Sequence, residues 1–444
     1  MYKTLDTIIY NATLVTVNAA FEIYSNGIIG IKNGKIEMIA DMPEGLEIPA
    51  GSEVIDAAGN IVMPGLVNTH THMPMTLFRG LADDLPLDVW LNQYIFPAEG
   101  AWINPENVRL GTALACAEML LSGTTTVCDG YFFEDAVAEI VSRAGIRGVL
   151  GQGVIDFPAP GVPHAGDNVH AAMAFTQKWN GLWPLIRPSI FCHAPYTCSR
   201  ETLKAAKAAA RSQGLLFQIH AAETAREQAL IEGCGEMSPV QYLDHIGVLD
   251  EQTLLIHSVW VDEKDVEIIA NSGAAVSHNP ESNMKLASGV APVHKFLPAG
   301  IPVGLGTDGC ASNNDLDMFQ EMDTAAKLHK VHTLDSTVMD ACSVLKMATI
   351  EAARAIGLSD EIGSLEKGKQ ADLIMVDTHQ PHMVPMYHPV SQIVYSARGS
   401  DVIDVMVAGR MLVRNRTLTS LDRNDILSRV KSLSKEIADF GKIG

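Results

Sequence analysis

Both ends of the chain carry short apolar segments with the texture of β-strands that bury one face. Five segments share it: residues 13–17, 27–31, 35–39, 371–377 and 404–413. Asn33-Gly34 is a strong hairpin turn signal, and Ala408-Gly409 indicates a second hairpin. Because chain ends often lie close together, we expect residues 1–61 and 372–444 to form one small β-sandwich domain. Within it, residues 426–440 predict an exposed amphipathic helix.

The middle of the chain repeats a different pattern, in which continuous apolar runs are separated by helical stretches. Such runs are typical of parallel strands that are buried on both faces. Helical patterns at residues 108–121 and 201–212 lie between them. Eight runs qualify as strands: residues 61–67, 123–129, 147–151, 189–193, 215–219, 253–256, 274–278 and 301–307. The pattern predicts an α/β fold with a (β/α)8 TIM-type barrel over residues 62–371.

Residues 82–104 interrupt this repeat with proline-flanked turns and little periodicity. A loop of this length inside a compact domain is usually functional. We therefore expect it to form a lid over the barrel mouth.

The composition excludes several classes of partner. A formal net charge of −20 over 444 residues argues against nucleic acid and anionic membrane surfaces. No apolar stretch approaches the roughly 20 residues needed to span a bilayer. The seven cysteines include no CxxC pair, which is typical of reduced thiols. No basic-then-apolar leader is evident at the N-terminus, so we expect a cytoplasmic protein.

His70 and His72 come at the end of the first apolar run of the repeat. Side chains at positions i and i+2 of a strand point to the same side, so we expect the two imidazoles to converge. Neutral imidazole binds zinc and iron well, and two at one strand end supply half of a metal site. A lone His-x-His pair is more often incidental, so this interpretation depends on further ligands.

Three later runs each lead into another ligand-type residue. These residues are His220 after 215–219, His257 after 253–256 and Asp308 after 301–307. Parallel strands of a closed barrel bring their C-terminal ends to one face, where enzymes with this fold keep their chemistry. A single histidine at a strand end is usually a core or loop residue. Four histidines and one aspartate at the same end of predicted strands indicate a metal site instead.

Four segments carry a resemblance to a known family. The segment MPGLVNTHTH at 63–72 resembles the opening signature of the amidohydrolase superfamily. SHNPESNMKL at 277–286 and GTDGCASNN at 306–314 are similar to its branch of 5-methylthioadenosine and S-adenosylhomocysteine deaminases. GSLEKGKQADL at 363–373 is similar to the stretch where such chains leave the barrel for the small domain. The resemblance covers nearly the whole chain.

The resemblance implies one divalent metal and its ligands, which would be His70, His72, His220 and Asp308. Zinc is the expected ion, with Fe²⁺ or Mn²⁺ as alternatives, because imidazole and carboxylate ligands suit all three. Relatives with two metals carry a bridging, carboxylated lysine at the end of the fourth strand. This chain has His193 there, so a single metal is expected.

The implied reaction replaces an aromatic C–NH₂ group with oxygen and releases ammonia. It needs hydroxide at neutral pH, and bound zinc lowers the pKa of water toward about 7. Glu223, three residues after His220, would act as the acid and base that protonates the ring. His257 and Asp308 can accept the proton of the water. The alternative for Glu223 is an exposed carboxylate that opens the following helix, and its place beside His220 favours the catalytic role.

The substrate implied by the resemblance is a small adenine nucleoside, converted to its inosine analogue. In this branch a glutamate late in the lid binds the ribose hydroxyls, and Glu99 matches it. Trp90 could stack on the purine, although a lone tryptophan is more often simply packed. His193 would hydrogen-bond the nucleoside, or else be a buried barrel histidine. Glu223 and Asp308 would also contact the substrate.

Gln152 marks a departure from the branch. Some members place an arginine after the third strand to pair with the carboxylate of S-adenosylhomocysteine, and this chain has Gln152 at the matching place. Glutamine lacks the charged, bidentate fork of arginine. The sequence therefore favours 5'-methylthioadenosine and adenosine over S-adenosylhomocysteine.

Two alternatives keep the same fold. A related aminohydrolase or chlorohydrolase could act on a free purine base or an s-triazine, in which case Glu99 would not matter for binding. A non-catalytic scaffold would be expected to lack one or more ligands, and here the set is complete. The family tends to form dimers or tetramers, so a homo-oligomer is expected.

Overall fold

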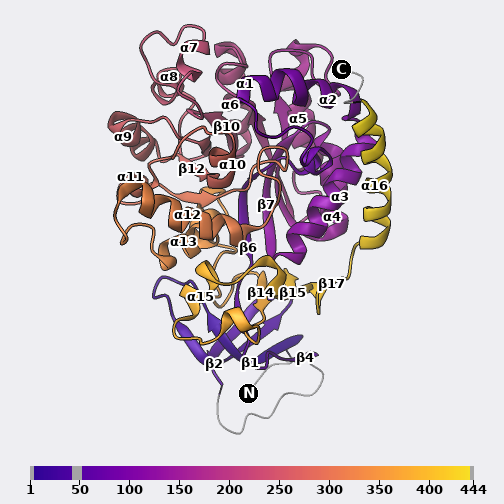
Figure 1. Ribbon diagram of the computed structural model, residues 1–444, viewed down its shortest axis with the longest axis vertical. Coiled ribbons are helices and arrows are strands. Elements are labelled where there is room, and N and C mark those ends of the chain that lie inside the picture. The colour runs from indigo at the N-terminus through magenta and orange to yellow at the C-terminus, as the bar shows by residue number, and fades with distance from the viewer. Residues whose placement is uncertain (1–4, 43–52, 441–444) are drawn as a thin grey trace.

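The computed structural model describes residues 5–42 and 53–440 and contains an eight-stranded parallel sheet in the order predicted for a barrel. Neighbouring strands in this sheet are also neighbours along the chain (Figure 1). Its strands are β6 (Leu66–Thr71), β7 (Thr124–Tyr131), β8 (Arg147–Val154), β9 (Ile186–Cys192), β10 (Phe217–Ala221), β11 (Thr253–His257), β12 (Ala275–His278) and β13 (Val303–Leu305). The predicted (β/α)8 architecture is confirmed.

The barrel strands are buried along almost their whole length. Only Arg187, near the start of β9, is exposed among their residues, which explains the continuous apolar runs of the sequence. The first and last strands meet at a seam, where the Asp308 amide donates to the His70 carbonyl at 2.9 Å. The Thr69 hydroxyl donates to the Leu305 carbonyl at the same distance of 2.9 Å. The seam therefore brings two predicted ligands together through the backbone.

Helices surround the sheet, and their ends follow the local sequence. Asn104, Ser199 and Asp262 accept hydrogen bonds from backbone amides at the starts of three helices. The principal helices are α3 (Pro105–Leu121), α4 (Glu134–Ala144), α5 (Asn168–Trp179), α6 (Arg200–Gln213), α8 (Pro239–His245), α9 (Glu263–Ser272) and α12 (Met318–Thr333). Shorter ones are α7 (Glu227–Leu230), α10 (Pro280–Lys285), α11 (Val293–Phe296), α13 (Ala341–Met347), α14 (Ile350–Ala355) and α15 (Pro389–Tyr395). The 3-10 helices are η1 (Met73–Phe78), η3 (Ala165–Asp167), η4 (Pro381–Met383) and η5 (Gly399–Asp401).

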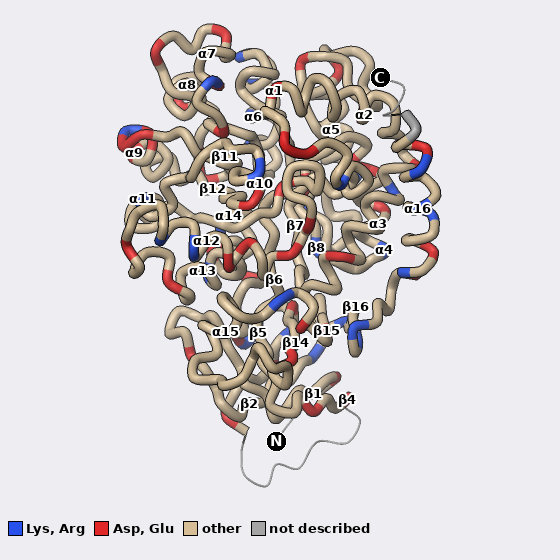
Figure 2. Tube along the Cα trace, in the orientation of Figure 1, with Lys and Arg blue, Asp and Glu red and all other residues tan. Residues whose placement is uncertain are grey.

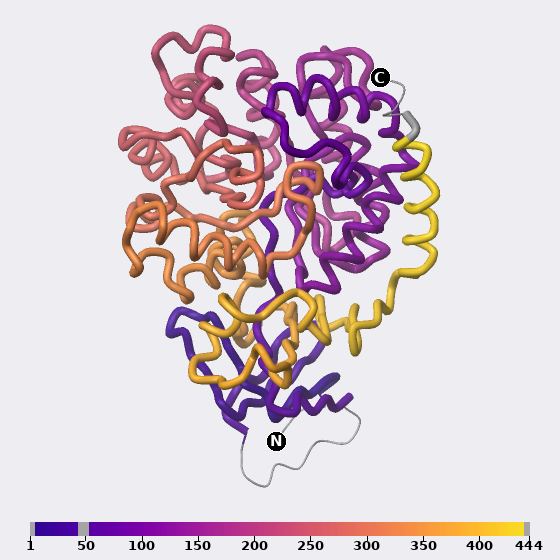
Figure 3. The backbone as a smooth tube through the Cα atoms, in the orientation of Figure 1, coloured from indigo at the N-terminus to yellow at the C-terminus, as the bar shows by residue number. Residues whose placement is uncertain are grey.

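A second sheet combines strands from both ends of the chain, as the sequence predicts. Along the sheet the order is β17-β16-β15-β14-β5-β1-β2-β3, and β4 pairs with β1. The strands are β1 (Thr7–Val15), β2 (Ile23–Lys32), β3 (Lys35–Asp41), β4 (Glu53–Asp56), β5 (Ile61–Pro64), β14 (Leu373–Val376), β15 (Val402–Val407), β16 (Arg410–Arg414) and β17 (Thr417–Leu418). The early and late segments lie side by side below the barrel (Figure 3) because β5 pairs antiparallel with β14.

The apolar run at residues 61–67 is two strands rather than one. β5 belongs to the small sheet and β6 to the barrel, and Gly65 separates them. A β-carbon at Gly65 would lie 2.2 Å from the Thr125 side chain, so only glycine fits this change of sheet. Periodicity could not reveal the break, because both strands are fully buried.

The segment at residues 82–104, predicted as a loop, is largely helical. It contains α1 (Leu87–Val89), the π-helix η2 (Trp90–Ile95) and α2 (Phe96–Trp102). Pro86 and Pro97 lie at helix starts, where a missing amide hydrogen costs nothing. The prolines that suggested turns therefore mark helix boundaries.

The predicted C-terminal helix is α16 (Arg423–Phe440), which runs along the barrel against α3 (Figure 1). Figure 2 shows acidic and basic residues mixed along α16. None of the helices in the described ranges combines the length and apolar character required to cross a membrane.

A buried ion pair joins the barrel to the small sheet. The guanidinium of Arg147, at the start of β8, donates to both carboxylate oxygens of Asp372 at 2.9 and 3.1 Å. Asp372 also accepts from the Ala408 amide at 2.6 Å. Both side chains of the pair are at most 4% exposed.

Removing one partner of this pair should destabilise the protein strongly. Arg147→Met leaves the Asp372 carboxylate buried without its cation, so the free energy of unfolding should fall by about 3–5 kcal/mol in urea titration. Arg109→Met is the matched control, because the Arg109–Glu139 pair is more than 40% exposed on both sides. Its loss should cost less than about 1 kcal/mol. Equal effects of the two substitutions would contradict the structural role of the buried pair.

Candidate metal centre and active-site pocket

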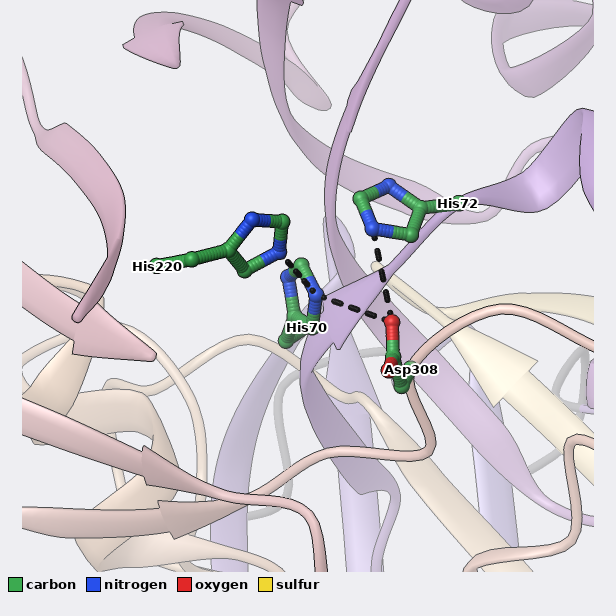
Figure 4. Close-up of side chains that lie close together, drawn as sticks. All are labelled: His70, His72, His220 and Asp308. Carbon is green, nitrogen blue, oxygen red and sulfur yellow. Dashed lines mark hydrogen bonds and ion pairs between the residues drawn. The ribbon is translucent and has the colours of Figure 1, made fainter. Parts of the chain in front are cut away.

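Four predicted ligands converge at the C-terminal end of the barrel strands (Figure 4). The potential ligand atoms of His70, His72, His220 and Asp308 all lie within 4.8 Å of one another. Asp308 Oδ1 is 3.2 Å from His70 Nε2 and 3.3 Å from His72 Nε2, and the Nε2 atoms of His70 and His220 are 3.2 Å apart. Three imidazole nitrogens and a carboxylate oxygen at these separations could hold one divalent metal.

The backbone explains this convergence. His70 lies in β6 and His72 directly follows it, so their side chains leave the strand on the same side. His220 is the second-last residue of β10. Asp308 follows β13, which lies across the seam from β6. Asp308 has a φ of 60°, a left-handed conformation that is costly for a residue with a β-carbon. The surrounding contacts hold it there.

The electrostatics of the four residues suit metal binding. Burial lowers the pKa of His70 to about 4, although its hydrogen bond to Asp308 opposes the shift. Burial and the neighbouring histidines hold the pKa of His220 well below its usual value. Burial alone would raise the pKa of Asp308, but the contacts with His70, His72 and His257 keep it well below its usual range. The imidazoles of His70 and His220 are therefore neutral, and the carboxylate is ionised, at neutral pH.

A second layer of contacts fixes the ligand orientations. His72 Nδ1 lies 2.6 Å from the Gly130 carbonyl, so Nδ1 carries the proton and Nε2 keeps its lone pair. Asp308 Oδ2 accepts from the hydroxyls of Ser282 at 2.7 Å and Ser312 at 2.9 Å. Outer contacts of this kind raise metal affinity by pre-organising the ligands.

Two further predicted residues flank this group. His257 Nε2 is 3.9 Å from Glu223 Oε2, and the ring of His257 lies 5.3 Å from that of His220. Glu223 does not open a helix, since α7 begins only at Glu227. Burial raises the pKa of Glu223, while the nearby His257 opposes the shift. A carboxyl with a raised pKa can carry a proton closer to neutral pH, as a catalytic acid requires.

A pocket with about 760 Å³ of space, its open mouth included, leads to these residues. His72, His220, Glu223, His257 and Asp308 form its floor. The lid contributes Leu87, Trp90, Leu91, Ile95, Phe96 and Glu99. The predicted lid segment thus lies over the barrel mouth, and its apolar side chains enclose a mainly apolar space with a few polar groups.

Glu99 is a buried carboxylate in the pocket wall. It accepts a hydrogen bond from the Tyr131 hydroxyl at 2.5 Å. Burial raises its pKa to about 7, although the tyrosine hydrogen bond opposes this shift. Among the described residues Tyr131 is the one side chain that donates to Glu99, and a buried carboxylate with a single such donor can accept further donors from a ligand.

His193 and Trp90, for which the sequence predicts contacts with the substrate, also line the pocket. His193 Nδ1 is 2.9 Å from the Thr197 hydroxyl, and burial lowers its pKa to about 4, so the ring is neutral. The indole Nε1 of Trp90 is buried and finds no hydrogen-bond partner among the described residues. Buried tryptophan N–H groups usually have a partner, so this donor is available to a ligand.

Gln152 is not brought together with the other predicted residues. Its side-chain oxygen accepts from the Glu134 amide at 3.1 Å, and it lies outside the set of residues that line the pocket. The neighbouring Gly153 and Val154 line the pocket instead. The Gln152 side chain is occupied by its contact with the first residue of α4, Glu134.

Several contributors were missed from the sequence. Tyr131 ends β7, a strand-end position that the same reasoning could have singled out. Ser282 and Asn283 lie inside the quoted segment at 277–286, but nothing in their spacing indicates what they contact. Ser312 lies in the segment at 306–314 and contacts Asp308 only through the fold of that loop.

Comparison with known proteins agrees with the geometry. The profile described as "Amidohydrolase family" matches residues 61–412. The chain is 45% identical over 435 residues to a 5-methylthioadenosine/S-adenosylhomocysteine deaminase of Syntrophobacter fumaroxidans, covering 97% of this chain and 98% of that protein. It is 44% identical over 435 residues to a 5'-deoxyadenosine deaminase of Methanosarcina mazei, with the same coverage of 97% and 98%.

A solved structure is also similar to this chain in sequence and fold. A zinc-bound adenosine deaminase from Xanthomonas campestris superimposes with a TM-score of 0.94 at 37% identity, covering 98% of each chain. The resemblance seen in the sequence motifs is confirmed, and the chain belongs to the amidohydrolase family.

Proposed function

We propose that this protein hydrolyses the exocyclic amino group of adenine nucleosides, giving the inosine analogue and ammonia. One observation carries the proposal: Glu223 and His257 stand 3.9 Å apart beside the four-ligand group, at the floor of a pocket walled by Glu99. The substrates expected are 5'-methylthioadenosine and adenosine. The similar proteins named for deamination of 5'-substituted adenosines support this choice.

We propose one divalent metal, most simply zinc, held by His70, His72, His220 and Asp308. The zinc in the similar adenosine deaminase structure supports this identity. His193 lies at the end of β9, where a second metal would need a bridging lysine. When bound, the metal lowers the pKa of water toward about 7 and so supplies hydroxide at neutral pH.

The chain's own residues would move the protons. Glu223 would protonate the ring nitrogen next to the attacked carbon, since its raised pKa keeps a proton available. His257 Nε2 and Asp308 are placed to accept the proton of the attacking water. Their proton would then pass to the amino group, so that ammonia leaves, and the proton of the new hydroxyl would return to Glu223 as the carbonyl forms.

Substrate recognition would depend on the pocket wall. Tyr131 donates to Glu99 Oε1 and leaves acceptor positions on the carboxylate free. Through these positions Glu99 would accept hydrogen bonds from two ribose hydroxyls. Trp90 would offer its indole N–H or ring to the nucleoside, and His193 would hydrogen-bond it. Gln152 has no place in this scheme, because it does not line the pocket, so it gives no reason to exclude S-adenosylhomocysteine.

The zinc-loaded protein should release ammonia from adenosine, 5'-methylthioadenosine and 5'-deoxyadenosine, and less or none from adenine, guanine or an aminotriazine. Ammonia release against this panel, with S-adenosylhomocysteine included, tests the proposal. Glu223→Gln should keep its metal but lose about 100- to 10,000-fold in kcat, the usual size of general acid–base catalysis. Activity confined to a free base or a triazine, or full activity of Glu223→Gln, would contradict it.

Metal content separates ligands from neighbours. His220→Asn should reduce bound zinc after dialysis from about one ion per chain to well under half, because a catalytic site has only three or four protein ligands. His193→Asn is the control, since its ring lies 5.3 Å from His220 but outside the ligand group. Elemental analysis should find wild-type zinc in that variant. Zinc loss in both variants alike would argue against the proposed ligand set.

The pH dependence of KM should report Glu99. Only the ionised carboxylate accepts two hydroxyl donors, so KM for nucleosides should fall as the pH rises to the Glu99 pKa of about 7 and then level. Glu99→Gln should raise KM and remove this dependence. Glu99→Ala should raise KM for adenosine about 10- to 100-fold, the value of a charged hydrogen bond. The inhibition constant of free adenine should not change; a parallel change would show that Glu99 contacts the base instead.

A further inference from the structure

The segment SHNPESNMKL contains two adjacent residues that contact two different groups of the site. It begins with the last two residues of β12 and continues into the short helix α10. The Ser282 hydroxyl donates to Asp308 Oδ2 at 2.7 Å, and Asn283 Oδ1 lies 2.9 Å from His257 Nδ1. A single helical turn therefore reaches both groups to which we assign the proton of the attacking water.

Asn283 is committed to His257. It is 1% exposed, and within the described part of the chain its Nδ2 atom has no hydrogen-bond partner. Burying an amide with an unsatisfied donor costs free energy. The hydrogen bond to His257 is the side-chain contact that offsets this cost. That contact is made with the back of the His257 ring, away from Glu223.

The contact decides which ring nitrogen carries the proton. A neutral imidazole has one donor and one acceptor, and the amide oxygen of Asn283 can only accept. Nδ1 must then carry the proton and Nε2 must keep its lone pair. A second amide, Asn279 Nδ2, lies 3.3 Å from Nδ1, a longer and weaker contact whose donor cannot bond to a protonated Nδ1.

We propose that Asn283 is the positioning residue that holds the proton of His257 on Nδ1, so that Nε2 faces Glu223 and the metal centre as an acceptor. The proposal rests on the proposed function for its catalytic consequence but not for the hydrogen bond itself. His257 has a φ of 74°, so its backbone is held in a costly conformation and the ring enters the site in a defined direction. The Asn283 amide then determines which tautomer of the His257 ring faces the site.

Kinetics of three variants test the consequence. In Asn283→Leu, which keeps the volume but removes the acceptor, kcat for adenosine should fall about 10- to 100-fold with KM within about twofold and zinc content unchanged. Asn283→Asp restores an acceptor and should recover most of the loss. Asn60→Leu is the control: Asn60 is a buried amide of the small sheet that accepts from the Thr378 backbone amide at 2.9 Å, so it matches the structural cost alone. An equal kcat in Asn283→Leu and Asn60→Leu would overturn the proposal.

A spectroscopic measurement tests the hydrogen bond without any turnover. Long-range ¹H–¹⁵N correlation spectra of the zinc-loaded protein, with the His257 signals assigned by their loss in His257→Gln, report the tautomer directly. We expect Nδ1–H in the wild type and in Asn60→Leu, and Nε2–H in Asn283→Leu. An Nε2–H tautomer in the wild type would overturn the proposal even if the deaminase activity is found. If no nucleoside releases ammonia, an Nδ1–H signal that depends on Asn283 still supports the positioning role, and only the proposed function fails.

Discussion

The buried negative charge of Asp308 is the constraint on which the site depends. An ionised carboxylate is expensive to bury unless opposite charges or several donors surround it. Here one oxygen accepts from the Gly309 amide at 2.8 Å and faces His70 and His72, and the other accepts two hydroxyls. A divalent cation would complete this balance, because the histidines alone bring no charge while they are neutral.

The same constraint organises the strands around it. Asp308 is bonded through its backbone to His70 across the seam of the barrel, so closing the sheet and assembling the ligands are one event. His72 shares the end of β6 with His70, and His220 and His257 come from the ends of β10 and β11, which lets the rigid sheet set the distances. The helical lid then supplies part of the pocket wall, including Glu99, and within the described residues none of the four grouped ligands comes from it.

The small sheet stabilises the opposite end of the barrel. β5 leads into β6 through Gly65, and the Arg147–Asp372 pair joins the start of β8 to the segment that enters β14. In barrel enzymes the face at the strand N-termini serves stability and the other face serves chemistry. The separation allows the lid and the loops of the site to vary without weakening the sheet below.

The sequence alone determined the barrel strands, the small sheet from both ends and the convergence of His70, His72, His220 and Asp308. The strands follow from the periodicity of apolar residues, and the convergence follows because parallel barrel strands end at one face. A homo-oligomer and a cytoplasmic location stay predictions. Only the tertiary structure decided that residues 82–104 are largely helical, that Gln152 contacts the Glu134 amide outside the pocket lining, and that Asn283 contacts His257. Those outcomes depend on which side chains meet across space, and periodicity along one chain holds no information about a partner many residues away.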